Sequence, residues 1–388
     1  MSTHQMAGRM VTARDDIPVT VEWQGPVITA ITYLDAPRAE LPLLAPGLVD
    51  LQVNGYGGLD VNTESITVDT VIELSHILAS RGVTTWLPTV VTAAEERIVE
   101  AVRCVARART ADPVVANAVP SVHVEGPFIS DHDGARGVHD PSFVRSLDIE
   151  EVSRWREAGP VGIVTISPHG EHAAEQVRSL TRLGVTVAIG HTHASSDEVS
   201  AAVGAGATLS THLGNGIPTT LPRHPNIIWR QLADDRLHAG LIADGHHLPF
   251  DTLEVMLRAK SIERAFLVSD STEIGGRPPG RYQTAVGSVV ELSEDLRLSE
   301  AGSDLLAGAA ASLLDGVRNV MHGTSFGIHD ALLLATRNPA RLAPGVRPGV
   351  GELRVGGPAD LMALDDSDPH GPSLLGVVQS GRWVTPTC

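Results

Sequence analysis

The feature of this sequence that most restricts its fold is a unit repeated eight times between residues 48 and 272. Each unit has a short apolar run rich in β-branched residues, then a polar break, then an amphipathic stretch. The eight runs are LVDLQVNG, VTTWLPTVV, SVHVEGPF, VGIVTISP, VTVAIGHTH, ATLSTHLGN, HAGLIADG and AFLVSDST. Because apolar residues are continuous in them, the runs are typical of strands that are buried on both faces. We therefore expect parallel strands joined by helices.

The stretches between the runs carry the signals of helix ends. Ser195 with Glu198, and Asp251 with Glu254, have the spacing of capping boxes. Gly184 stands where a helix should stop. Eight strand-helix units favour a closed (β/α)8 barrel of the α/β class over an open doubly wound sheet, because no phosphate-binding glycine motif follows the first run.

The two ends of the chain read differently from the repeats. Residues 17–34 and 346–386 are rich in Val, Thr and Gly and predict short strands with turns. We expect a small β-sandwich domain built from residues 1–46 and 346–388, and a TIM-like barrel over residues 47–345.

Two further segments follow the eighth run. Residues 281–300 predict a hairpin, and residues 305–342 predict helical structure that ends at Asn338 and Pro339.

Composition excludes several classes of partner and site. The net charge of −17 argues against nucleic acid or an anionic membrane surface as a partner. The N-terminal residues lack the apolar core of a secretion signal, and no apolar run is long enough to span a bilayer, so we expect a cytoplasmic protein. Cys104 and Cys388 are the only cysteines, too few for a disulfide framework. Any metal ion must therefore be bound by His, Asp or Glu.

Polar side chains stand at the carboxyl ends of the predicted strands, where barrels of this type place their catalytic groups. Glu125 ends the third strand, His191 the fifth, His212 the sixth and Asp270 the eighth. Two imidazoles and a carboxylate can hold zinc and leave a position for water, whose pKa then falls to about 7. Each residue alone could be an ordinary polar group at a strand end, but the four together predict a metal site.

These residues lie in motifs that resemble the amidohydrolase superfamily and, within it, the N-acetylglucosamine-6-phosphate deacetylases. The motifs are HVEGPF (123–128), GHTHA (190–194), THLGNGIP (211–218), LIADGHH (241–247) and VSDST (268–272). The opening PGLVDLQVNGYGG (46–58) and the closing GELRVGGPADLMALD (351–365) match the same family, so the resemblance covers nearly the whole chain.

The resemblance implies a role for each site residue. Glu125, His191 and His212 would be the metal ligands, Asp270 the general acid/base, and His139 the group that polarises the acetyl carbonyl. An exposed loop histidine is the alternative for His139.

The first strand bears on the number of metal ions. It carries Gln52 and Asn54 where many amidohydrolases have two histidines. Amide side chains are poor zinc ligands, so we expect one divalent ion, zinc.

The resemblance also implies a phosphate site. Arg223 and His247 would contact the phosphate, and Asn215 and Gly216 would approach the same group. In the family this arginine comes from the neighbouring subunit, which implies a homodimer.

Several histidines depart from the family pattern. His224 and Asn226 replace Glu and Gly beside the phosphate arginine, His169 ends the fourth strand in place of Glu, and His246 replaces an apolar residue. These positions are compatible with neutral variation or with a changed sugar pocket. His193 is interpreted as a loop contact. His169 and His172 do not predict a second metal site, because no carboxylate motif accompanies them.

The function implied is hydrolysis of the small-molecule amino sugar N-acetylglucosamine-6-phosphate to glucosamine-6-phosphate and acetate. One alternative is deacetylation of an unphosphorylated or epimeric amino sugar. Ring opening of a cyclic amide is disfavoured because the first strand lacks the two histidines. A metal-bearing sugar-binding protein without catalysis is disfavoured because Asp270 accompanies a full ligand set.

Overall fold

The computed structural model describes residues 2–12, 14–284, 289–368 and 371–385. Outside the described residues lie Cys388, part of the predicted hairpin and short pieces of both predicted terminal segments; these are residues 1, 13, 285–288, 369–370 and 386–388.

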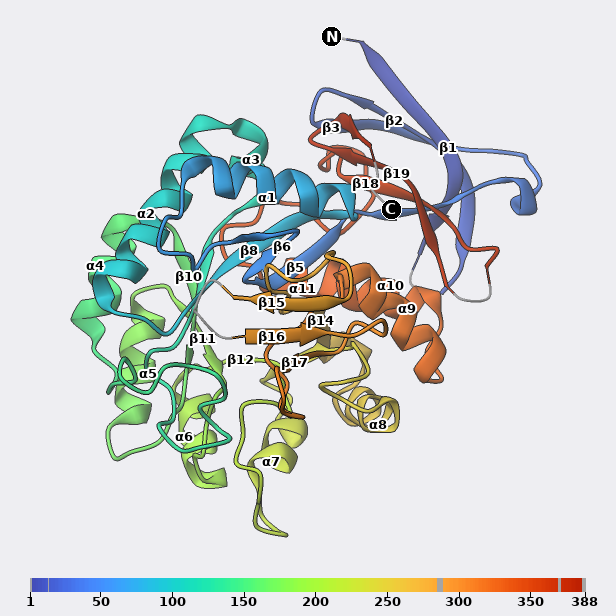
Figure 1. Ribbon diagram of the computed structural model, residues 1–388. Helices are drawn as coiled ribbons and strands as arrows, with labels where there is room; N and C mark the ends of the chain where they lie inside the picture. The colour runs from blue at the N-terminus through green and yellow to red at the C-terminus, as the bar shows by residue number, and fades with distance from the viewer. Residues whose placement is uncertain (1, 13, 285–288, 369–370, 386–388) are drawn as a thin grey trace.

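Eight parallel strands form one sheet, and a helix or helices follow most of them (Figure 1). In sheet order the strands are β5 (Leu48–Val53), β8 (Val83–Val91), β9 (Val122–Glu125), β10 (Val161–Ile166), β11 (Thr186–Ile189), β12 (Leu209–Ser210), β13 (His238–Ile242) and β14 (Ala265–Val268). The sheet closes because the chain after β14 pairs with β5: Asp270 N–H donates to the Gln52 carbonyl, and Asn54 N–H to the Ser271 carbonyl, both at 2.9 Å. The predicted (β/α)8 barrel is confirmed.

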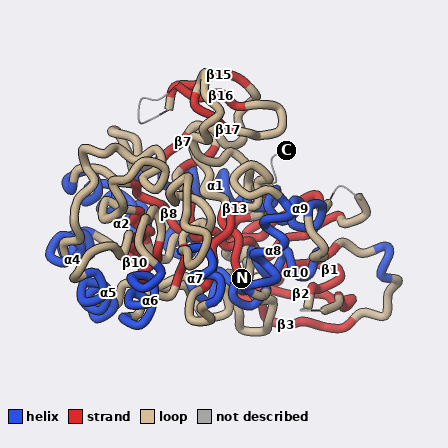
Figure 2. Tube along the Cα trace, turned by 90° about the horizontal axis from the view of Figure 1, so that it is seen from below, coloured by secondary structure: helices blue, strands red, loops and turns tan. Residues whose placement is uncertain are grey.

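The helices surround the barrel, as the tube view shows for α4, α5, α6, α7 and α8 (Figure 2). The helices are α1 (Val68–Ser80), α2 (Glu95–Ala111), α3 (Pro113–Ala118), α4 (Ile149–Ala158), α5 (Ala173–Arg182), α6 (Ser196–Ala205), α7 (Ile227–Ala233), α8 (Phe250–Lys260), α9 (Leu313–Gly323), α10 (Ile328–Ala335) and α11 (Arg337–Leu342), with short 3-10 helices at Arg38–Glu40 and Ile262–Arg264.

The predicted helix ends are partly confirmed. The capping box of Ser195 and Glu198 starts α6, and Gly184 follows the end of α5 with φ +76°. The box of Asp251 and Glu254 is wrong, because α8 begins directly after Pro249 without a side-chain cap. Asp251 then falls in the first turn, where its charge favours the helix dipole.

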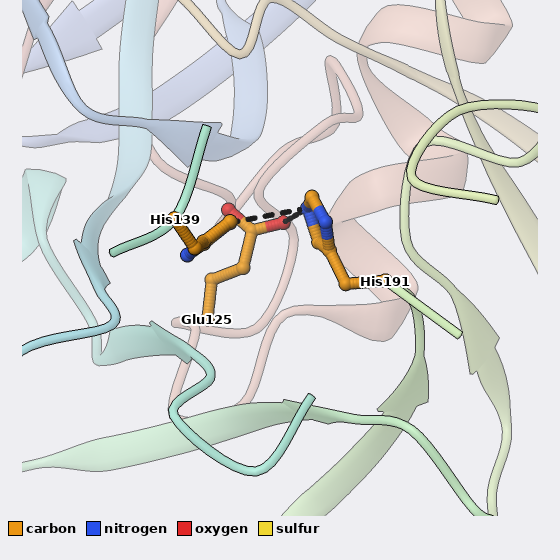
Figure 3. Close-up of side chains that lie close together, drawn as sticks. All are labelled: Glu125, His139 and His191. Atoms are coloured by element: carbon orange, nitrogen blue, oxygen red, sulfur yellow. Dashed lines mark hydrogen bonds and ion pairs between the residues drawn. The ribbon is translucent and has the colours of Figure 1, made fainter. Parts of the chain in front are cut away.

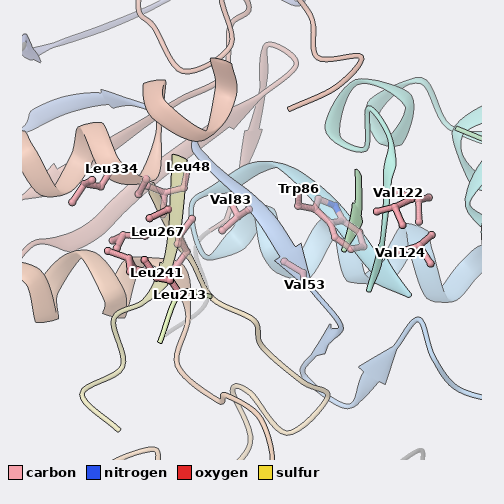
Figure 4. Packing of buried hydrophobic residues seen from close by; sticks show 14 of the residues in the cluster. Leu48, Val53, Val83, Trp86, Val122, Val124, Leu213, Leu241, Leu267 and Leu334 are labelled. Carbon is pink, nitrogen blue, oxygen red and sulfur yellow. The ribbon is translucent and has the colours of Figure 1, made fainter. Parts of the chain in front are cut away.

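The continuous apolar runs are explained by burial on both faces of the strands. Leu48 and Val53 pack outward against the helices, whereas Val49 and Leu51 of the same strand pack inward. Trp86 is fully buried in the outer layer (Figure 4). The inner apolar cluster fills much of the barrel below its carboxyl end, so the open part of the barrel lies at the rim.

Both chain termini build a second, seven-stranded sheet (Figure 1). In sheet order its strands are β20 (Arg382–Val384), β19 (Ser373–Gln379), β18 (Leu361–Asp365), β4 (Leu43–Pro46), β1 (Thr3–Val11), β2 (Asp16–Gln24) and β3 (Val27–Tyr33). The sheet folds back on itself, because the rings of Trp23 in β2 and Trp383 in β20 lie 5.8 Å apart although many strands separate them. This is the predicted small β-sandwich, with β1 as a strand that the sequence did not indicate.

Between β14 and α9 the chain forms a three-stranded antiparallel insertion, which projects from the body (Figure 2). Its strands are β15 (Gly280–Gln283), β16 (Val289–Leu292) and β17 (Leu298–Glu300), so the predicted hairpin is present with a third strand. A separate short hairpin is formed by β6 (Gly55–Tyr56) and β7 (Leu59–Asp60).

The predicted end of the helical structure at Asn338 and Pro339 is wrong. Pro339 lies in the first turn of α11, where its missing N–H leaves no helical hydrogen bond unmade.

Candidate active site

Glu125, His191 and His212 come together at the carboxyl end of the barrel. Nε2 of His212 lies 2.9 Å from Oε1 of Glu125 and 3.1 Å from Nε2 of His191, and the latter nitrogen lies 3.3 Å from Oε1 of Glu125. All three side chains are buried. The backbone is strained here, since His191, His212 and Asp270 have φ values of +45°, +27° and +50°. Such strain is concentrated at functional sites in proteins.

The donor set fits a divalent metal ion. Bonds of about 2.0–2.2 Å to one zinc ion place tetrahedral ligand atoms about 3.3 Å apart, close to the three separations here. Nδ1 of His191 lies 3.0 Å from the Ala135 carbonyl, so it carries the proton and leaves the Nε2 lone pair facing the other two groups. Anchoring of the second ring nitrogen in this way is typical of metal-binding histidines.

Two amide side chains of the first strand hold the site carboxylates. Nε2 of Gln52 donates to both oxygens of Glu125 at 3.0 Å, and Nδ2 of Asn54 donates to Oδ1 of Asp270 at 2.9 Å. Sequence reasoning considered Gln52 and Asn54 only as poor ligands and missed these hydrogen bonds. Their effect is to orient the two carboxylates.

The two carboxyl groups have opposite proton affinities. Burial raises the pKa of Asp270 to about 6, and the negative charge of Glu125 adds to this effect. Burial also acts to raise the pKa of Glu125, but the neighbouring imidazoles of His191 and His212 outweigh this effect and hold that pKa well below its usual range. Glu125 therefore stays anionic, whereas Asp270 can exchange a proton near neutral pH.

His139 reaches the same cavity from the segment after β9 and is not a solvent-exposed loop residue. Its Nε2 lies 3.3 Å from Nε2 of His191 (Figure 3). Its Nδ1 lies 2.9 Å from Oγ1 of Thr92. Burial and the neighbouring His191 lower the pKa of His139 to about 3. The imidazole is therefore neutral and can donate one hydrogen bond into the cavity. Thr92 is a contact that sequence reasoning did not identify.

The expected substrate-binding residues are only partly brought together. Asn215 and Gly216 adjoin the metal-binding residues: Nδ2 of Asn215 donates to the His212 carbonyl, and a Cβ on Gly216 would lie 2.8 Å from Nδ1 of His191. His247 is held by Asp244 through a 2.6 Å contact and is near enough to lower the pKa of Asp270. Arg223 is exposed, and within the described residues no hydrogen bond or ion pair joins its side chain to the site.

Asp50 is a buried carboxyl group that sequence reasoning missed. Its Oδ1 accepts the backbone N–H groups of Gln52 and Ser269, both at 3.2 Å, and so links the first and last strands. Burial raises the pKa of Asp50 to about 7. A charged residue inside a strand buried on both faces is the signal that could have indicated it.

Among the described residues, no helix combines the length and apolar character that crossing a membrane requires.

Comparison with known proteins assigns the family. The amidohydrolase family model matches residues 43–387. N-acetylglucosamine-6-phosphate deacetylase of Vibrio furnissii is 31% identical over 90% of this chain and 87% of its own length, and N-acetylgalactosamine-6-phosphate deacetylase of Escherichia coli O157:H7 is 31% identical over 88% and 87%. A mutant of the Mycobacterium smegmatis N-acetyl-D-glucosamine-6-phosphate deacetylase, solved with N-acetyl-D-glucosamine-6-phosphate, superposes with a TM-score of 0.87 at 27% identity, covering 99% of this chain and 100% of that one. The chain belongs to the amidohydrolase family, in the branch that contains these amino-sugar-phosphate deacetylases.

Proposed function

We propose that this protein hydrolyses the acetamide bond of N-acetylglucosamine-6-phosphate to give glucosamine-6-phosphate and acetate. The observation that carries the proposal is the convergence of Glu125, His191 and His212 next to Asp270, a carboxyl group with a pKa of about 6. The relatives named above act on this substrate or on its galactose epimer, which supports the substrate class.

Glu125, His191 and His212 would hold one divalent ion, which we propose to be zinc. When bound, such an ion supplies a water that ionises near neutral pH and a positive charge toward the carbonyl oxygen. A single ion in this cavity is supported by Gln52 and Asn54, whose amide N–H groups face the carboxylates of Glu125 and Asp270. An amide side chain is also a poorer zinc ligand than an imidazole.

The chain's own residues then move the proton. Asp270 accepts a proton from the attacking water as the new C–O bond forms at the acetyl carbon. Asp270 returns that proton to the sugar nitrogen as the C–N bond breaks, so the amine leaves neutral. His139 donates a hydrogen bond to the acetyl oxygen as negative charge develops there. The other ring nitrogen of His139, Nδ1, forms a hydrogen bond with the hydroxyl group of Thr92.

We propose that the phosphate is bound by His247, Asn215 and Gly216 of one subunit and by Arg223 of a second copy of this chain. Arg223 is exposed on the loop before α7, which protrudes from the barrel (Figure 1). The same region exposes half of the surface of Trp229, a residue type common in protein interfaces. We therefore propose a homodimer.

We also propose that the protein is located in the cytoplasm. Its two cysteines are too few for the disulfide framework that is typical of proteins in oxidising compartments.

The deciding experiment is acetate release by the zinc-loaded protein from N-acetylglucosamine-6-phosphate, with unphosphorylated N-acetylglucosamine as the control. We expect efficient turnover of the phosphorylated sugar and at least about a hundredfold lower kcat/KM without the phosphate. N-acetylgalactosamine-6-phosphate is the second candidate, because its deacetylase from E. coli O157:H7 is equally similar to this chain. Absence of acetate release from every sugar would contradict the proposed chemistry.

A further inference from the structure

A second group of histidines lies on the rim of the barrel, outside the residues assigned to catalysis. The rings of His132 and His193 are stacked with centroids 3.7 Å apart, and the ring of His169 lies 4.5 Å from that of His193. His132 belongs to the segment after β9, His169 follows β10 and His193 follows β11. Three imidazoles from three separate segments therefore meet at one point.

The ring orientations leave nitrogen atoms available for a ligand. Nδ1 of His193 lies 2.6 Å from Oγ of Ser130, and Nδ1 of His169 lies 2.7 Å from Oγ of Ser167. In the described part of the chain, no hydrogen bond involves Nε2 of either ring. One nitrogen fixed by a polar group and the other left accessible is the arrangement that metal-binding histidines share.

A carboxylate completes the group. The nearest ligand atoms of Asp131, His132 and His193 all lie within 4.8 Å of one another. The side chains of Asp131 and His132 are 75% and 60% exposed, so small rotations can bring their donor atoms to the roughly 3.3 Å spacing around one ion. A metal here is not predicted from the sequence, because no carboxylate motif accompanies His169. Asp131 comes from another segment of the chain.

We propose that Asp131, His132 and His193 bind a second divalent transition-metal ion, with His169 as a fourth ligand once its ring turns toward the group. Mixed imidazole and carboxylate ligands suit zinc or nickel better than magnesium or calcium. The site shares no ligand with the one formed by Glu125, His191 and His212.

The second ion would restrict the motion of the segment after β9, which carries His139. The same segment already touches His191 twice: Ser130 N–H donates to the His191 carbonyl at 2.8 Å, and the Ala135 carbonyl accepts from its ring. Binding at His132 adds a link from this segment to the ends of β10 and β11. We infer that the second ion acts as a structural clamp beside the catalytic cavity.

Metal stoichiometry tests the proposal without any turnover assay. The full chain is stripped with a chelator, dialysed against Zn²⁺ and assayed for zinc per chain, and Ni²⁺ binding is followed by calorimetry. We expect two zinc ions per chain in the natural protein and one in each of the variants His132→Gln and His169→Gln. In both variants the affinity of the weaker Ni²⁺ binding step should fall at least tenfold. His224→Gln, which alters another exposed loop histidine, is the matched control and should keep both ions.

Two results would overturn the site: one zinc per chain in the natural protein, or unchanged metal binding in both His132→Gln and His169→Gln. The proposal stands apart from the deacetylase function, because loss of acetate release with two bound ions would reject only the function. In Glu125→Gln, the central ion should be weakened while the second remains.

Discussion

Asp270 and Glu125 show how two carboxyl groups in one cavity acquire different chemistry. Glu125 lies 2.9 and 3.3 Å from the Nε2 atoms of His212 and His191 and accepts two hydrogen bonds from Gln52, and these contacts stabilise its anion. Asp270 is mostly buried but accepts only one side-chain hydrogen bond, from Asn54, among the described residues. Burial therefore dominates at Asp270 and raises its pKa, which suits a group that must take up and release a proton.

We predict that Asp270→Asn lowers kcat by about 10²- to 10⁴-fold, because the amide cannot accept a proton from water. The bound metal should remain, since Asp270 is not among the three proposed ligands. Single-turnover acetate release and zinc content per chain measure the two effects. Loss of zinc together with activity would mean that Asp270 is a ligand and not the proton carrier.

Asp50 leads to a prediction about stability and pH. Its folded-state pKa of about 7 lies above the usual value of 3.8, so the folded state binds more protons than the unfolded state between these values. The stabilisation by protonated Asp50 is full below pH 4 and is lost as the pH rises through 7. The loss amounts to about 1.4 kcal/mol for each unit between the two pKa values, as an upper bound.

We expect Asp50→Asn to remove this pH dependence, because one amide oxygen can keep both N–H contacts of Gln52 and Ser269. Denaturant unfolding at pH 5 and pH 8 provides the measurement. The variant should gain stability relative to the natural protein at both values, but less at pH 5 than at pH 8, because most of the loss occurs between pH 5 and pH 7. An equal difference at both values would contradict the raised pKa.

At the level of elements, the loop after β12 depends on a glycine that stands against a proposed metal ligand. Gly216 has φ +58°, and a Cβ there would lie 2.8 Å from Nδ1 of His191. Its carbonyl also accepts the Thr192 N–H at 2.9 Å, so the loop cannot easily move away. The loop after β12 thereby fixes the imidazole that follows β11.

Gly216→Ala should displace the His191 ring and lower kcat by about 10²-fold with weaker zinc binding. Gly302→Ala is the matched control, because Gly302 also has positive φ, +82°, but no atom lies within 4 Å of its added Cβ. Both variants carry the same type of backbone strain, so only Gly216→Ala should affect the site. Equal loss of activity in both would show that strain, and not the contact with His191, is responsible.

The features that could be predicted from the sequence are those whose signals lie within one short segment. The eight apolar runs and the polar residues at their ends are local patterns, and they correctly indicated the strands and the meeting of Glu125 with His191. Only one of the nine residues of strand β1 is buried, so its alternation carries little apolar signal. The contacts of Asp131 with His193 and of Gln52 with Glu125 join distant segments, and only the closed barrel brings them together.

At the scale of the whole molecule, a single chain does not explain how Arg223 could reach the active site. A guanidinium is well suited to bind phosphate, yet this one is exposed on a protruding loop and, within the described residues, forms no hydrogen bond or ion pair with His247 or Asp270. In a twofold symmetric dimer the loop of each subunit reaches the other in the same way. The proposed homodimer therefore predicts that each site is complete only when two chains associate.

Mixing two inactive variants tests this prediction. Arg223→Ala chains keep Asp270 but lack the phosphate contact, and Asp270→Asn chains keep Arg223 but lack the proton carrier. After subunit exchange about half of the dimers are mixed, and each mixed dimer contains one complete site, so activity should recover to about a quarter of the natural value. If both groups acted within one chain, no mixed dimer would contain a complete site, and the activity would stay at the average of the two variants.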